Sequence, residues 1–125
     1  MLTIRKEQMG VFETLFLERF RKTLRLHLRE EFAEETTKMT DGELDKLIQL
    51  ASDRARTYNV TTECDVTLFA DLMFLKSRDF DRDPALPWVR TMLLDRELDG
   101  ATKMQAIYRR FAAFENRKSM PEELQ

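Results

Sequence analysis

The chain has 125 residues, of which 42% are hydrophobic and 35% are charged, and its formal net charge is −2. This length suits one domain with a buried core and is too short for two, while three glycines and three prolines leave little material for the turns of β-sandwiches and barrels. The negative balance argues against a generic polyanion-binding protein, which usually carries a clear basic excess.

We therefore expect an all-α fold: a compact bundle of about five helices, with a long first helix and a buried third helix. The helical patterns end near residue 117, so we expect a single α-helical domain over 1–117 and a frayed polar tail over 118–125.

The first predicted helix starts at a Thr3 cap and runs to about Ala33. It carries a stripe of large apolar residues spaced by four, and a second set widens this stripe; the stripe is Phe12, Phe16, Phe20, Leu24, Leu28 and Phe32, and the second set is Leu15, Leu17 and Leu26. Two interpretations stay open. The helix is either the centre of the bundle, or part of its apolar arc is a docking surface for a partner.

Charge is unevenly distributed along the first third of the chain. Residues 19–29 hold five basic residues, Arg19, Arg21, Lys22, Arg25 and Arg29, whereas residues 30–45 hold seven acids and Lys38. The simplest interpretation is that these two runs are solvated faces that pair with each other across the bundle. The functional interpretation is that Arg21 and Arg25 face a partner.

Two capping boxes mark the next helices. Thr40 and Glu43 open a helix over about 41–58 with Leu44, Leu47, Ile48, Ala51, Ala55 and Tyr58 on one face, and Asn59 can end it in the left-handed conformation. Thr62 and Asp65 open the third helix, whose buried stripe is Val66, Phe69, Leu72 and Met73 and is widened by Leu68, Phe74 and Leu75.

The segment Asp79 to Pro84 has alternating aspartates and invites comparison with a calcium-binding loop. An EF-hand loop beginning at Asp79 would need glycine where Pro84 stands and a bidentate acid where Arg90 stands, so the structural interpretation is favoured. We expect Asp83 to cap a helix whose first residue is Pro84, with Trp88 on its inward face. A last helix over about 101–117 places Lys103, Arg109 and Arg110 on its outer face.

The sequence holds no metal-ligand cluster, no phosphate-binding glycine loop and no plausible catalytic triad. We interpret Cys64 as a small apolar filler near a helix start, and His27 is predicted on a long helix among arginines, so a catalytic Cys/His pair is not expected. No signal-peptide core and no stretch of 18 apolar residues is present. We expect a cytoplasmic protein that is not an enzyme and has no cofactor and no metal.

Three segments resemble a family of short bacterial proteins encoded beside type VI secretion effector, spike and adaptor genes. They are MLTIRKEQM at the start, DVTLFADLMF from Asp65, and DFDRDPALPW from Asp79. The family often has a glycine shortly before the last segment, where Lys76, Ser77 and Arg78 stand here. The resemblance implies an accessory role, as a co-chaperone or adaptor that helps an effector reach the secretion spike, and it supplies no catalytic residues.

These observations predict a protein-interaction module whose partner is a secretion effector or its chaperone, with no nucleic acid and no membrane as partner. The candidate partner-binding residues are Phe12, Phe16, Arg21, Arg25 and Trp88. An immunity protein is a variant of the same physical class. The alternative from another class is a small DNA-binding regulator that uses the basic run of residues 19–29 together with Arg109 and Arg110.

Overall fold

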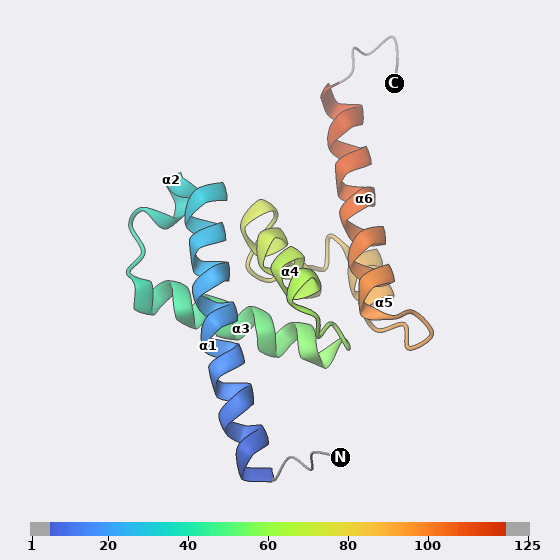
Figure 1. Cartoon of the computed structure of the whole chain (residues 1–125). Coiled ribbons are helices and arrows are strands. Elements are labelled where there is room, and N and C mark those ends of the chain that lie inside the picture. Colours follow the sequence, from blue (N-terminus) through green and yellow to red (C-terminus); the bar gives the residue numbers. More distant parts are fainter. Residues whose placement is uncertain (1–5, 120–125) are drawn as a thin grey trace. The chain divides into compact units, whose positions relative to one another are not determined.

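The computed structural model describes the backbone from Lys6 to Ser119 and the side chains from Leu17 to Ala113. Within that range the fold is all-α, as predicted, with one more α-helix than expected (Figure 1). The elements are α1 (Lys6–Glu31), α2 (Ala33–Thr36), α3 (Asp41–Thr57), α4 (Glu63–Leu75), the 3₁₀ turn η1 (Phe80–Arg82), α5 (Pro87–Leu93) and α6 (Gly100–Ser119).

Backbone contacts divide the chain into an N-terminal unit, residues 1–49, and a C-terminal unit, residues 50–125, so α3 contributes to both. A single domain over 1–117 remains a prediction. The predicted tail over 118–125 begins inside α6, and its residues 120–125 lie outside the described range, as does the predicted Thr3 cap.

In the N-terminal unit, α1 ends earlier than its apolar stripe predicts. Phe32 leaves the helical conformation at φ −125° and ψ 52°, and the short helix α2 follows it. Phe20, Leu24 and Leu28 of the stripe are buried. Leu17 and Leu26 of the second set are instead 45% and 63% exposed, so the buried arc of α1 is narrower there than the sequence suggests.

The predicted capping box at the start of α3 is present in both directions. The Glu43 amide donates to Thr40 Oγ1 and the Thr40 amide donates to Glu43 Oε1, each at 3.1 Å. The backbone N–H of Thr40 lowers the pKa of Glu43, because it stabilises the carboxylate. All six predicted apolar residues of this helix are buried, and Asn59 ends it at φ 62°.

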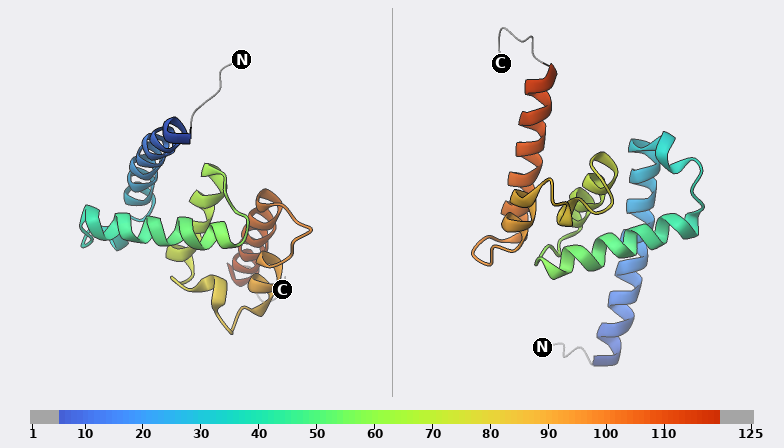
Figure 2. Two further views of the ribbon diagram at one scale, coloured as in Figure 1. Left: turned by 90° about the horizontal axis from the view of Figure 1, so that it is seen from below. Right: turned by 180° about the vertical axis from the view of Figure 1, so that it is seen from behind.

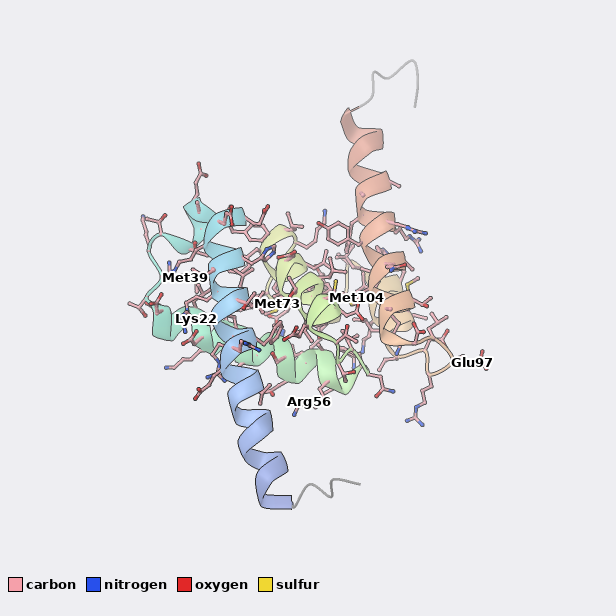
Figure 3. The ribbon with its side chains drawn as sticks, viewed as in Figure 1. Lys22, Met39, Arg56, Met73, Glu97 and Met104 are labelled. Atoms are coloured by element: carbon pink, nitrogen blue, oxygen red, sulfur yellow. The ribbon has the colours of Figure 1, made fainter. Side chains whose placement is uncertain are left out.

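In the C-terminal unit, Thr62 caps α4 by accepting from the Asp65 amide at 3.2 Å. The Asp65 carboxylate accepts a hydrogen bond from the Thr62 hydroxyl, whereas in a full capping box it would accept from the Thr62 backbone N–H. Val66, Phe69, Leu72 and Met73 are buried as predicted. Helix α4 packs on α6, and both views in Figure 2 show α5 beside α6. Met73 of α4 and Met104 of α6, labelled in Figure 3, belong to this interior.

Four local predictions are wrong in this unit. Leu75, predicted to widen the buried stripe of α4, is 47% exposed. The helix after the aspartate turn begins at Pro87 rather than Pro84, and Leu86 rather than Asp83 precedes it. Cys64 is exposed on the first turn of α4 and fills no core space. Lys103 is only 2% exposed, although we expected it on the outer face of the last helix with Arg109 and Arg110.

Gly100 is required where α6 begins. A Cβ atom at this position would lie 2.7 Å from the Asn59 carbonyl oxygen and 3.1 Å from Val60 Cα, and both are backbone atoms that cannot easily move. The absence of a side chain therefore lets the first turn of α6 meet the segment that ends α3.

None of the helices within the described part of the chain is both long enough and apolar enough to cross a membrane.

Replacing Leu72 by alanine should lower the free energy of unfolding by about 2–5 kcal/mol, because the side chain is 1% exposed and its removal leaves a cavity. Leu75 lies on the same helix but is 47% exposed, so Leu75→Ala is the matched control and should cost less than about 0.5 kcal/mol. Chemical denaturation of both variants measures the difference. Equal losses would contradict the orientation of α4.

Candidate functional site

The predicted partner-binding residues lie in different parts of the chain. Phe12 and Phe16 belong to α1, but their side chains lie outside the described residues. Arg21 and Arg25 are on α1 in the N-terminal unit, and Trp88 is on α5 in the C-terminal unit.

The basic run of α1 bonds to the segment that follows it. Arg25 makes two hydrogen bonds of 2.9 Å to the Asp45 carboxylate, and this pairing raises the pKa of Arg25. Arg21 donates to Gln49 Oε1 at 2.9 Å. Lys22, labelled in Figure 3, is exposed on the same helix.

Arg29 joins the end of α1 to the connection between α2 and α3. Its guanidinium donates to the carbonyl oxygens of Thr36 and Met39 and to the carboxylate of Asp41, at 2.8 to 2.9 Å. The interpretation that the basic and acidic runs pair with each other is therefore confirmed for Arg25 and Arg29. Reversing the charge at Arg25 would oppose Asp45, so this change would disturb the N-terminal unit itself.

The three aspartates of the segment 79–83 have three separate roles. Asp79 pairs with Arg54 at 2.7 Å, and Asp83 accepts from the Ala85 amide at 2.9 Å in a turn. Asp81 is fully buried, and its carboxylate accepts from the Tyr58 hydroxyl at 2.8 Å and lies 3.4 Å from Arg54. Over the described residues, no group of three or more potential His, Cys, Asp or Glu ligands is arranged to hold a metal ion.

Burial of the Tyr58 hydroxyl is the main reason why the pKa of this group is raised, and the hydrogen bond to the Asp81 carboxylate adds to the effect. Arg54, with a side chain 15% exposed, also donates to the Arg78 carbonyl oxygen at 2.9 Å. This buried polar cluster, Arg54, Tyr58 and Asp81, fixes the aspartate turn to the last part of α3.

Trp88 is the centre of a second group of side chains on the C-terminal unit. Its ring lies 5.1 Å from the Phe111 ring, and the Arg110 guanidinium carbon lies 4.3 Å from the indole centroid. Lys76 Nζ lies 4.7 Å from the Phe111 centroid. We call these four residues, Lys76, Trp88, Arg110 and Phe111, the aromatic–cation surface. Each contact is within the range of favourable cation–π and tilted aromatic pairs.

Three elements hold the aromatic–cation surface in place. Lys76 follows the last residue of α4, Trp88 is in the first turn of α5, and Arg110 and Phe111 are neighbours on α6. Phe111 is 8% exposed, so it anchors the group, while Trp88 is half-buried and Arg110 is exposed. Sequence reasoning selected Trp88 alone. Arg110 was considered only for the DNA-binding alternative, and Lys76 and Phe111 were missed, because the proximity of these residues depends on how α4, α5 and α6 pack.

Comparisons with known proteins give no relative for this chain: no family model, no curated protein and no solved structure matches it.

Replacing Asp81 by alanine should lower the free energy of unfolding by about 3 kcal/mol, because the Tyr58 hydroxyl and the Arg54 guanidinium each lose a buried acceptor. Asp83→Ala removes a carboxylate of the same segment from a turn nearer the surface, and it should cost about 1 kcal/mol or less. Denaturation with and without calcium measures both. Saturable calcium binding that disappears in Asp81→Ala would contradict the structural role.

The raised pKa of Tyr58 predicts how stability depends on alkaline pH. Its contribution is fully present below the ordinary tyrosine pKa of about 10, and it is lost as the pH rises through the higher pKa of the folded protein. The chain has two tyrosines, so Tyr108→Phe leaves Tyr58 as the only reporter. Tyrosinate absorbance of this variant should rise at higher pH when folded than when denatured. Coincident titrations would contradict the buried hydrogen bond.

Proposed function

We propose that the chain is a protein-interaction module that binds an acidic face of a partner protein at the aromatic–cation surface. The observation that carries this proposal is the position of Trp88, which is half-buried and contacts both the Arg110 guanidinium and the Phe111 ring.

Tryptophan and arginine are the residue types that most often supply large shares of binding energy in protein interfaces. Trp88 is the only tryptophan of the chain. Its contact with Phe111 restricts the indole before any partner arrives, so less side-chain freedom is lost on binding. Two exposed apolar side chains of the same helices, Leu75 of α4 and Tyr108 of α6, supply further apolar area.

Charge favours an acidic partner. Over residues 87–93 and 100–113 the C-terminal unit carries Arg90, Arg109 and Arg110 as exposed cations, and these two stretches contain no acid. Cations at the edge of an interface accelerate association with a surface of opposite sign and disfavour partners of like sign.

The resemblance of three segments to proteins encoded beside type VI secretion genes supports a more specific role. In this role the partner is a secretion effector or its chaperone, and the chain acts as an adaptor or co-chaperone. An immunity protein that binds a toxin would use the same kind of surface. The DNA-binding alternative loses support at residues 19–29, because Arg25 and Arg29 already bond to carboxylates of their own unit.

Native co-purification and mass spectrometry should identify the partner, and the complex is then rebuilt from purified proteins. Trp88→Ala should weaken binding by about 30-fold or more, and Arg110→Glu by about 10-fold, chiefly through slower association. Arg56→Glu is the matched control: Arg56 is exposed on α3, is labelled in Figure 3 and should leave the affinity unchanged.

Circular dichroism of each variant separates lost binding from lost folding, and Arg110, being exposed, keeps the test valid if Trp88→Ala unfolds. Two results would contradict the proposal. One is a partner whose affinity is the same for the wild type and for both variants. The other is a salt-sensitive complex with duplex DNA that is tighter than about 10 μM at physiological salt, which would support the regulator instead.

A further inference from the structure

Lys103 is a buried lysine of the C-terminal unit. It is 2% exposed, and its Nζ donates to the Tyr58 carbonyl oxygen at 2.9 Å. Among the described residues it has no carboxylate within ion-pairing distance. An ammonium group has three N–H donors, so one hydrogen bond leaves two donors without a protein acceptor.

The end of α3 balances only part of this charge. Tyr58 directly follows the last residue of α3, and its carbonyl belongs to the negative end of that helix. The helix end is equivalent to roughly half an elementary charge, whereas the ammonium carries a whole one. Buried charges in proteins are usually paired, so the remaining charge calls for an anion.

A pocket of about 350 Å³ lies at this position. Its lining is Thr57, Tyr58, Asn59, Leu93, Leu94, Arg96 and Lys103, all from the C-terminal unit. The volume is within the range of small-molecule sites, and five of the seven lining residues have polar side chains.

The groups around the pocket are suited to a negative ligand. Lys103 and Arg96 are the two cations of the lining, and the Tyr58 hydroxyl is directed to Asp81 instead. The adjoining loop holds three acids outside the lining, Asp95, Glu97 and Asp99, and two of them accept from backbone amides: Asp95 from Glu97 and Asp99 from Thr102. The lining contains no carboxylate that would repel an anion.

We propose that this pocket binds a small oxyanion, a carboxylate or phosphate group on a compact ligand, with Lys103 as its buried charge partner and Arg96 at the opening. The Lys103 ammonium keeps its bond to Tyr58 and directs its two remaining donors to the ligand oxygens. The site is separate from the aromatic–cation surface and does not depend on the proposed function.

The test is to titrate the full chain with inorganic phosphate and, separately, with succinate at low ionic strength. The chemical shifts of the backbone amides are recorded by NMR at each step. Succinamide, which has the same carbon skeleton without charge, is the ligand control. We expect saturable shifts at residues 57–59 and 93–96, with a Kd below about 1 mM for at least one anion. The anion that binds more tightly, phosphate or succinate, shows whether the pocket prefers a phosphate or a carboxylate group on its ligand.

Lys103→Met keeps the length of the side chain and removes its charge, and it should weaken binding by at least about 10-fold. Arg96→Ala changes an exposed loop residue and should weaken binding by about 3-fold to 10-fold, which keeps the test valid if Lys103→Met does not fold. Arg56→Ala should bind as the wild type does. Shifts that do not saturate, that occur equally with succinamide, or that are unchanged in a folded Lys103→Met or Arg96→Ala variant would overturn the proposal.

Discussion

The C-terminal unit depends on two hydrogen bonds of Tyr58, one made by its side-chain hydroxyl and one by its backbone carbonyl. Its hydroxyl donates to the buried Asp81 carboxylate, and its backbone carbonyl accepts from the buried Lys103 ammonium. One residue just after α3 therefore binds the aspartate turn and α6 at once. Its ring also stacks with Phe69 of α4, at 6.3 Å between centroids, and Phe69 in turn contacts Phe80 at 4.9 Å. Polar and apolar contacts of the unit thus meet at the same residue, and the hydrogen bond from the buried Lys103 ammonium also positions α6.

Much of the fold could be predicted because it is encoded locally. The capping box of Thr40 and Glu43 joins residues three positions apart, and the left-handed Asn59 is a property of one residue. The apolar face of α3 and the buried stripe of α4 follow from the helical period, which needs no knowledge of the partner helix.

The remainder depends on contacts that the helical period does not encode. Lys103 shares the polar character of its exposed neighbours, but its acceptor lies 45 residues earlier in the chain, so no local pattern reveals its burial. Asp83 has the residue type and the following proline of a helix cap, yet it forms a turn with Ala85. Trp88 could be selected as a candidate site residue, whereas Arg110 and Lys76 join it only through the packing of three helices.

The close approach of Gly100 to Asn59 has a consequence for the order in which the C-terminal unit can fold. The bond from Lys103 to Tyr58 in this region spans 45 residues. Closing a flexible loop costs a free energy that grows only with the logarithm of its length, and all contacts formed at the closure share that cost. A short connection joins the end of α3 to α4, and the rings of Tyr58 and Phe69 meet across it, so this contact needs only a short closure. Docking of α6 is then the long-range step, and it shields the Lys103 ammonium from water only when that step is complete.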